Sequence, residues 1–542
     1  MDAITVVPEP ANEPIRSYAP GSAERAAITR TLDVLAREPI DIHPVIGGSR
    51  SPAGDASVHE VRMPSDRSTL LARVRQTTAA DADAAIRAAH AAKADWAAMP
   101  FDERAAVFLR AAELLSGPRR DLLNAATMLG QGKTVQQAEI DSACELIDFL
   151  RFNVAFARQL YANQPISSAA VWNRLDYRPL DGFVYAITPF NFTAIAGNLP
   201  TAPALMGNTV IWKPALTQTF AAHFWMDLLR EAGLPEGVIS MLPGHGSEIS
   251  SVALGHQDLA GIHFTGSTRV FQGLWGEVGA NIAGYRAYPR LVGETGGKDF
   301  VVAHPSADPA AVVAALIRGA FEYSGQKCSA ASRCYLPRGL WNLIKDELVG
   351  QTEALAVGDV RDLANFTSAV IDERAFEKLS GAIDRARGSA DAQVIAGGTY
   401  DRSEGWYVRP TLITSDNPRQ DIFTTEYFGP ILGIFIYEDD EYSDVLRLVD
   451  ETSTYALTGA VFATERAAVV QASGALRHAA GNFYVNDKPT GAVVGQQPFG
   501  GSRASGTNDK AGSLWNLMRW VSPRSIKENL LPPTSTGYPH ML

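Results

Sequence analysis

One cysteine stands in a stretch whose composition suits nucleophilic chemistry. Residues 321–333 read FEYSGQKCSAASR, so Cys328 lies among small residues where a substrate could approach. A thiolate attacks carbonyl groups well, and its pKa falls when Lys or backbone N–H groups surround it. Lys327 precedes this cysteine and Ser329 follows it. A free cysteine is more often a small buried hydrophobic residue, so this stretch alone does not assign a nucleophile.

A carboxylate upstream supplies the second half of a possible catalytic pair. Residues 290–302 read RLVGETGGKDFVV, and Glu294 stands between an apolar run and a glycine pair. This pattern is typical of the end of a buried strand, where a carboxylate needs a specific reason to be present. Glu294 is therefore a candidate general base for Cys328.

Composition limits the classes of protein that come into question. The chain has 542 residues, 46% hydrophobic and 20% charged, which is typical of a soluble protein with two or three domains. Its net charge of −11 argues against a nucleic-acid surface. Three cysteines are too few for a disulfide framework, and no group of His, Cys, Asp or Glu has the spacing of metal ligands. We therefore expect neither a nucleic-acid partner nor a metal.

The N-terminal sequence does not match the pattern of a targeting signal. No run of eighteen apolar residues is present, which disfavours a spanning helix and a membrane association. Asp2, Glu9 and Glu13 are unsuited to a transit peptide, and the basic and apolar order of a secretory signal is missing. These observations predict a cytoplasmic protein.

The chain then alternates between buried strands and helices. Helical periodicity covers residues 81–116, interrupted at Pro100, and residues 141–164. Short β-rich runs follow at 183–190, 208–215, 237–244 and 260–267, each closing on Gly, Pro or a small polar residue. Such alternation predicts a parallel sheet with crossover helices and ligands at the carboxyl ends of its strands. A second α/β series follows Lys298, and a coil rich in Gly, Gln and Pro covers residues 490–512.

Seven short motifs occur in a fixed order along this α/β region. They are TPFNF (188–192), WKPA (212–215), FTGS (264–267), GETGGK (293–298), GQKCS (325–329), EYFGP (426–430) and PFGG (498–501). In this order they resemble the aldehyde dehydrogenase superfamily, over about residues 80–515. The resemblance implies an α/β fold with a Rossmann-type cofactor domain, an α/β catalytic domain and a small β oligomerisation arm.

The resemblance also implies a division of the chain. It assigns 1–166 and 181–297 to an NAD-binding domain with an N-terminal helical arm, and 298–489 to the catalytic domain. It assigns 490–512 to a substrate-anchoring loop, and 167–180 and 513–542 to oligomerisation segments. We accordingly expect a homodimer or a higher homo-oligomer.

The resemblance assigns the chemistry residue by residue. It implies that Cys328 attacks an aldehyde as a thiolate, and that the Asn191 side chain and the Cys328 backbone N–H hold the resulting oxyanion. After hydride transfer to the nicotinamide, a water molecule activated by Glu294 would hydrolyse the thioester. Considered alone, Asn191 could equally be a turn amide that bonds its own backbone.

The implied cofactor is NAD. The residues that match the cofactor-binding positions of the family are Thr188, Phe190, Lys213, Gly266, Ser267, Glu426 and Phe428. A helix start that follows FTGS suits the pyrophosphate. Leu216 stands where many members carry an acidic residue that pairs with the adenosine ribose, so the choice between NAD and NADP stays open.

A narrower resemblance, to the Δ1-pyrroline-5-carboxylate dehydrogenases, rests on residues 131–153, 324–333 and 490–512. It implies that the α-carboxylate of a small-molecule substrate is held by a serine and by loop N–H groups, that a phenylalanine packs on its chain, and that a glutamate faces its ammonium. The residues at these positions, with a neighbouring lysine, are Ser329, Gly491, Ala492, Phe499, Glu139 and Lys327.

The function implied is NAD-dependent oxidation of glutamate γ-semialdehyde to glutamate, the second step of proline degradation. A separate proline dehydrogenase would then supply the substrate. Alternatives are a dehydrogenase of another semialdehyde such as succinate semialdehyde, a non-catalytic paralogue on the same scaffold, and a reductase working towards the aldehyde. Intact Cys328, Glu294 and Asn191 disfavour the paralogue, and the presence of a hydrolytic base disfavours the reductase.

Overall fold

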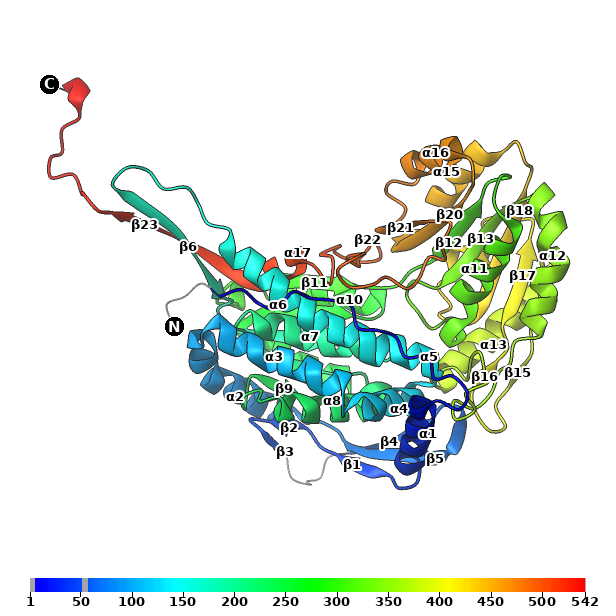
Figure 1. The fold of residues 1–542 in the computed structure, drawn as a ribbon, viewed down its shortest axis with the longest axis horizontal. Helices are drawn as coiled ribbons and strands as arrows, with labels where there is room; N and C mark the ends of the chain where they lie inside the picture. The colour runs from blue at the N-terminus through cyan, green and yellow to red at the C-terminus, as the bar shows by residue number, and fades with distance from the viewer. Residues whose placement is uncertain (1–4, 51–56, 542) are drawn as a thin grey trace.

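The fold is built around two large sheets, each in its own lobe (Figure 1). A computed structural model describes residues 5–50 and 57–541 of the chain. A long two-stranded arm projects from the first lobe and carries the C-terminus at its far end (Figure 1). Both lobes combine a sheet with helices, as the predicted α/β class requires.

The first sheet is parallel except at one edge. Its strand order is β11 (Arg290–Glu294), β10 (Leu259–Thr265), β7 (Phe183–Ile187), β8 (Thr209–Lys213), β9 (Ile239–Met241), β2 (Val45–Ile46) and β3 (Ser49–Arg50). All strands from β11 to β9 run in parallel, and β2 joins β9 in the antiparallel sense.

Alternating side chains of these strands enter two different cores. Phe183, Tyr185 and Ile187 pack with one layer of helices, formed by α2 (Ala79–Ala98), α9 (Gly246–Gly255) and α10 (Thr268–Ala280). Val184 and Ala186 face the other layer. That layer contains α3 (Phe101–Ser116), α4 (Arg120–Gln131), α6 (Leu146–Ala162), α7 (Thr193–Leu205) and α8 (Thr219–Glu231).

The second sheet is also parallel except at one edge. Its strand order is β14 (Ala392–Ala396), β17 (Thr411–Ser415), β18 (Ile431–Tyr437), β13 (Ala331–Pro337), β12 (Asp299–Ala303), β20 (Thr458–Phe462) and β21 (Asn482–Val485). Only the pairing of β14 with β17 is antiparallel. The helices around it are α11 (Pro309–Phe321), α12 (Arg338–Glu353), α13 (Glu373–Gly388), α15 (Tyr442–Thr452) and α16 (Arg466–Ala475).

The arm pairs two segments that are distant in sequence. Strand β6 (Val171–Pro179) runs antiparallel to β23 (Val521–Asn529) along their full length (Figure 1). A further small sheet has the order β1 (Ile40–Ile42), β5 (Asp66–Arg75), β4 (Val58–Met63). The short elements are α5 (Val135–Ala138), α14 (Asp421–Thr424), α17 (Leu514–Met518) and the strand pairs β15 (Tyr400–Asp401) with β16 (Tyr407–Val408) and β19 (Tyr455–Ala456) with β22 (Ser502–Arg503).

One predicted helix is interrupted. The periodicity over 141–164 predicts one continuous α-helix, but a π-helical turn, η1 (Glu139–Glu145), precedes α6. Such turns are rare and frequently occur at functional sites. The turn changes the direction in which its carboxylates point, and this matters for the site described below.

The N-terminal segment before α1 (Ala23–Leu35) is bound to the helical layer by polar contacts. Asn12 Nδ2 and Glu13 N donate to the two oxygens of Asp148, both at 2.7 Å. The Glu13 carboxylate forms ion pairs with Arg120 and Arg151. None of the described helices is long and apolar enough to cross a membrane.

Candidate active site

Cys328 follows a tight turn between α11 and β13. A short 3-10 helix, η4 (Glu322–Gly325), contains three consecutive residues with positive φ: Tyr323 at 52°, Ser324 at 50° and Gly325 at 64°. A side chain at Gly325 would meet the Gly429 carbonyl oxygen at 2.4 Å, so only glycine fits there. Directly after this left-handed turn, the Gln326 carbonyl is in contact with Asn191, which follows β7. The turn therefore places the cysteine near the carboxyl ends of the strands of the first sheet.

Asn191 lies between the end of β7 and the start of α7. Its Nδ2 donates a hydrogen bond of 3.0 Å to the backbone carbonyl of Gln326, two residues before the cysteine. The other N–H of an amide remains available for a substrate oxygen. The structure thus brings the predicted oxyanion donor to the predicted nucleophile.

The buried ion pair of Lys133 and Asp141 anchors the start of α7, next to Asn191. The Asp141 carboxylate accepts from the backbone N–H groups of Thr193 at 2.9 Å and Ala194 at 2.8 Å, at the start of α7. Lys133 Nζ lies 2.7 Å from the same carboxylate and 4.0 Å from the centroid of the Phe192 ring. Lys133 and Asp141 were missed by the sequence reasoning, because the backbone N–H groups that donate to Asp141 follow it by more than fifty residues.

Glu294 is the last residue of β11 and forms an isolated antiparallel bridge with Gly506. Burial raises the pKa of its carboxyl group to about 8. It therefore changes protonation near neutral pH, as a general base should.

The resting Cys328 thiol is neutral. Burial raises its pKa well above the ordinary value, and the negative charges of Glu294, Asp299 and Glu426 raise it further. Lys327 does not counter this effect, because its ammonium forms an ion pair of 3.0 Å with Glu322. The expectation that a neighbouring lysine lowers this pKa is therefore wrong, and the same ion pair gives Lys327 a partner other than a substrate.

The loop of residues 490–512 contacts Ser329, the residue after the candidate nucleophile. The Oγ atoms of Ser329 and Thr490 are 2.8 Å apart, and both residues are buried. Gly491 follows with φ 98°, a conformation that favours glycine, and Ala492 is half-buried beside it. Phe499 exchanges two backbone hydrogen bonds with Ala511, which closes the loop on itself.

Glu139 is not available to a substrate, which corrects its predicted role. It is fully buried, and its carboxylate accepts from Arg16 N at 2.8 Å, Tyr18 Oη at 2.8 Å and Asn124 Nδ2 at 2.8 Å. It also forms an ion pair with Arg120. These partners use the accepting capacity of both oxygens, so Glu139 fixes the N-terminal segment to α4.

Replacing Glu139 with Ala should therefore destabilise the fold. Removing Glu139 leaves the buried Arg120 with only one of its two carboxylates, that of Glu13, and breaking a buried ion pair typically costs about 3–5 kcal/mol. The measurement is the free energy of unfolding in urea. Glu113→Ala is the matched control, because the ion pair of Glu113 with Arg151 is 70% exposed on the glutamate side and exposed pairs contribute about 0–1 kcal/mol. Equal stability of the two variants would contradict this role.

Glu145, at the other end of η1, was missed. Burial raises the pKa of its carboxyl group to about 8, with contributions from the charges of Asp141, Asp148 and Glu294. Within residues 5–50 and 57–541, its carboxylate makes no hydrogen bond or ion pair. Helical periodicity predicts that Glu139 and Glu145 point in different directions. Which of the two lies near Glu294 is determined only by the fold.

The predicted cofactor residues lie at the carboxyl ends of the first sheet and across from it. Lys213 ends β8, and its Nζ donates only a long bond of 3.3 Å to the Pro214 carbonyl among the described residues. Thr188 Oγ1 accepts from Trp212 Nε1 at 3.0 Å. Burial lowers the pKa of Lys213 to about 8. The ammonium of a half-buried lysine with so little compensation suits an oxygen-rich ligand.

Of the remaining predicted cofactor residues, Gly266 and Ser267 follow β10 of the first sheet, and Glu426 and Phe428 precede β18 of the second. Gly266 donates to the Glu294 carbonyl at 3.2 Å, and Ser267 caps α10 by accepting from Val270 N. Glu426 accepts from Gly297 N at 2.9 Å, and burial raises the pKa of its carboxyl group.

Phe428 has φ 60° and contacts Phe190 with ring centroids 5.8 Å apart. The contact joins the two lobes, because Phe190 follows β7 of the first sheet and Phe428 precedes β18 of the second. The predicted cofactor positions on either side of the nucleophile are therefore held together.

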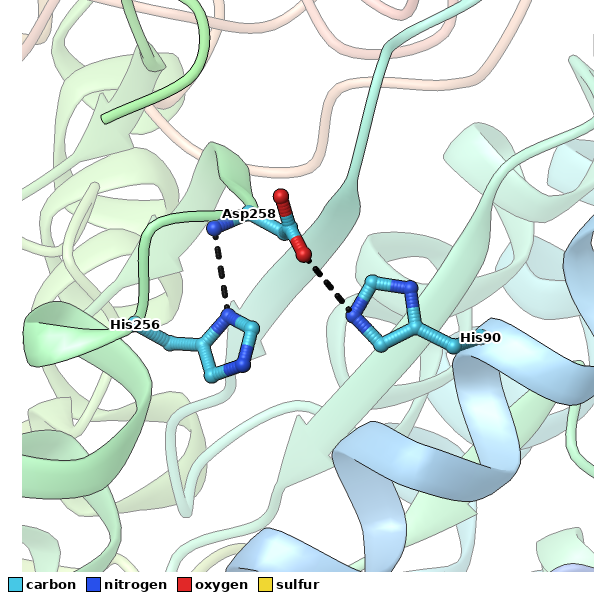
Figure 2. Close-up of side chains that lie close together, drawn as sticks. All are labelled: His90, His256 and Asp258. Carbon is cyan, nitrogen blue, oxygen red and sulfur yellow. Dashed lines mark hydrogen bonds and ion pairs between the residues drawn. The ribbon is translucent and has the colours of Figure 1, made fainter.

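A cluster of His90, His256 and Asp258 lies at the amino end of β10, away from the carboxyl ends that carry the candidate site (Figure 2). His90 Nε2 is 3.2 Å from one oxygen of Asp258, and Arg286 Nε is 2.6 Å from the other. His256 Nδ1 accepts from the Asp258 backbone N–H at 3.1 Å, so in the neutral ring its Nε2 carries the proton. The cluster is satisfied by its own contacts, and the absence of a metal stays a prediction.

Comparisons with known proteins give similarity over the full length. The solved structure of the Δ-pyrroline-5-carboxylate dehydrogenase from Mycobacterium tuberculosis bound with NAD is 60% identical, covers 100% of both chains and has a TM-score of 0.97. The mitochondrial Δ1-pyrroline-5-carboxylate dehydrogenase of Dictyostelium discoideum is 50% identical over 99% of this chain and 96% of its own. Proline utilization A from Bdellovibrio bacteriovorus is 29% identical, with a TM-score of 0.91, over 96% of this chain and 53% of its own.

The expected cytoplasmic location is contradicted by these comparisons, because the Dictyostelium relative and other eukaryotic relatives are named mitochondrial. The expectation used acidic N-terminal residues as evidence against a transit peptide. Asp2 lies outside the described residues, but Glu13 pairs with Arg120 and Arg151. The charge of Glu13 serves packing and therefore carries no information about the compartment.

A model described as the aldehyde dehydrogenase family matches residues 52–526. The two-lobed α/β fold and the order of the seven motifs agree with that match, and the predicted family and fold class are confirmed. The chain belongs to the aldehyde dehydrogenase family.

Proposed function

We propose that this protein oxidises L-glutamate γ-semialdehyde, the open form of Δ1-pyrroline-5-carboxylate, to L-glutamate with NAD. The names of the Mycobacterium and Dictyostelium relatives support the substrate, and the bound NAD of the former supports the cofactor. The observation that carries the proposal is the contact between Ser329 and Thr490, which joins the residue after the nucleophile to a loop rich in N–H donors. A carboxylate substrate needs such an anchor next to the reacting carbon.

The residues present fit NAD. The half-buried Lys213 offers an ammonium that lacks a strong acceptor, and α10 begins directly after Ser267 at the carboxyl end of β10. Helix starts favour the negative charge of a pyrophosphate. Glu426 offers a carboxylate to ribose hydroxyls. When bound, NAD supplies the acceptor for the hydride that leaves the substrate carbon.

The first half of the reaction forms a covalent adduct. Because the Cys328 thiol is neutral at rest, Glu294 takes its proton as the sulfur attacks the aldehyde carbon. The S–C bond forms, and the carbonyl electron pair moves to the oxygen. Asn191 Nδ2 and the Cys328 backbone N–H stabilise this oxyanion, and one such donor typically contributes about 3–4 kcal/mol. Loss of hydride leaves a thioester.

The second half releases the acid. Glu294 must lose the first proton to solvent, after which its carboxylate takes a proton from water. The resulting hydroxide attacks the thioester carbon, the C–S bond breaks, and the sulfur takes the proton that Glu294 removed from the water. A positioned base of this kind contributes about 10²–10⁴ in rate.

The two charged groups of the substrate have separate partners in this proposal. Ser329 and the N–H groups of Gly491 and Ala492 hold the α-carboxylate, and Phe499 packs on the aliphatic chain. Glu145 replaces Glu139 as the partner of the α-ammonium, because its carboxylate is unpaired among the described residues and lies close enough to Glu294 for their charges to interact. An ammonium beside Glu145 would favour its ionised form.

The test compares two aldehydes on two proteins. The wild type should turn over Δ1-pyrroline-5-carboxylate with a kcat/KM more than about tenfold above that for succinate semialdehyde, a difference of about 1.4 kcal/mol. Glu145→Gln should raise KM for the amino substrate by about tenfold or more and leave succinate semialdehyde, which has no ammonium, nearly unchanged. Equal losses on both aldehydes would contradict the role of Glu145. Equal wild-type rates would favour a less selective semialdehyde dehydrogenase.

Assembly and partners are part of the proposal. The arm of β6 and β23 would pair with a second copy, giving a homodimer or larger homo-oligomer, because it projects from the body with exposed strand edges (Figure 1). A separate proline dehydrogenase would supply the substrate, which the name of the longer Bdellovibrio relative supports. We also keep the proposed division of the chain. It comprises an NAD-binding domain (1–166 with 181–297), a catalytic domain (298–489), a substrate-anchoring loop (490–512) and oligomerisation segments (167–180 and 513–542).

A further inference from the structure

The C-terminal half of the 490–512 loop runs along the end of β11. Gly293 N donates to Thr507 Oγ1 at 3.0 Å, and Thr507 N donates back to the Gly293 carbonyl at 2.9 Å. Gly506 forms the bridge to Glu294. The loop therefore holds the backbone of the residue that carries the general base, in addition to its contact with Ser329.

Lys510, three residues after Thr507, is held in place within this loop by hydrogen bonds. Its Nζ donates to the carbonyl oxygens of Gly481 at 2.8 Å and Gly500 at 2.9 Å, and to Asn482 Oδ1 at 3.3 Å. An ammonium has three N–H bonds, and all three are directed at these oxygens. The charge is consequently immobile, and it acts on Glu294 through space rather than by donating a hydrogen bond.

We infer that Lys510 is a positioning residue for the base, whose fixed positive charge favours the carboxylate form of Glu294 that activates water. The inference rests on the proposed function, because it assigns Glu294 its role in thioester hydrolysis. Lys510 itself touches neither substrate nor cofactor in this scheme.

The charges that face Glu294 differ in sign. Lys510 lowers the pKa of Glu294 and Asp509, its neighbour in the loop, raises it, against the larger effect of burial. Glu145 from η1 and Cys328 from the nucleophile turn also face it, and its negative charge raises the pKa of both. Lys510 is the cation in this group, so removing it should leave the carboxylate without local compensation.

The adjacent opposite charges allow a matched pair of variants. Lys510→Met should raise the pKa of Glu294, and hence move the acid limb of the turnover profile up by about one pH unit. Asp509→Asn should move the same limb down, and Lys510→Arg should leave it near the wild-type position. The Met variant should recover turnover at high pH, whereas a displaced loop would lower turnover at every pH.

A second readout is independent of turnover. Infrared difference titration of the protein without cofactor follows the C=O band of the protonated Glu294 carboxyl group, which Glu294→Gln identifies by removing it. The band should persist to higher pH in Lys510→Met and disappear at lower pH in Asp509→Asn. Thermal unfolding monitored by circular dichroism verifies that each variant is folded.

The outcomes separate the inference from the function on which it rests. An unchanged Glu294 titration in folded Lys510→Met, or shifts of the same sign in both variants, would overturn the role of Lys510. Failure of the wild type to form NADH from Δ1-pyrroline-5-carboxylate would overturn the proposed function, whatever the infrared titration gives.

Discussion

Cys328→Ala should abolish NADH formation from Δ1-pyrroline-5-carboxylate, with kcat falling by about 10⁴-fold or more. Without the sulfur no thiohemiacetal forms, and the other groups have no bond to act on; removing the nucleophile of a serine protease costs about 10⁶-fold. The measurement is NADH absorbance at saturating substrate. Thiol alkylation of the wild type should be slow at neutral pH and accelerate as pH rises, since the resting thiol has a raised pKa.

Cys334→Ala is the control for this experiment. Cys334 lies in β13 and is fully buried, so its loss removes a packed sulfur from the core without touching the site. It should keep near wild-type kcat. Turnover by Cys328→Ala, or an equal loss in Cys334→Ala, would contradict the assignment of the nucleophile.

Glu294→Gln should lower steady-state turnover by about 10²–10⁴-fold, because water is no longer activated against the thioester. The acid limb that the wild type should show near pH 8, where Glu294 ionises, should vanish. One equivalent of NADH per subunit should still form at high pH, where Cys328 loses its proton without the base. Continued turnover after that first equivalent would show that another group activates the water.

The same substitution has a consequence for stability. The pKa of Glu294 is raised on folding, so the folded state binds this proton more tightly than the unfolded chain does, where the pKa is about 4.3. Its contribution to the free energy of unfolding is complete below about pH 4 and is lost as pH rises through about 8. Glu294→Gln should therefore be more stable than the wild type above pH 8, as measured by urea unfolding.

The fold was accessible from sequence because its signals are local. The central strands of the first sheet are short apolar runs such as FVYAI at 183–187, whose residues alternate between two helix layers. The motif order located Cys328, Glu294 and Asn191, which the structure brings together. Contacts within a few residues, or a fixed order of motifs, were sufficient for this part.

The errors concern charges, whose partners are distant in sequence. Glu139 was assigned to the substrate ammonium and Glu145 was missed, because the π-helical turn that separates their directions has no sequence signature. Lys327 was expected to activate Cys328, but it pairs with Glu322 on the other side of a left-handed turn. The pKa of a buried group depends on the whole surrounding shell, and that shell is defined only by the folded chain.

The polar anchoring of the N-terminal segment has a consequence for synthesis. Asn12 and Glu13 leave the ribosome early, but their partners Arg120, Asp148 and Arg151 follow more than one hundred residues later. At about 5–20 residues per second, the segment waits on the order of ten seconds without its partners. It therefore docks as a late step of co-translational folding, and until then the Arg120 guanidinium lacks one of its two carboxylates.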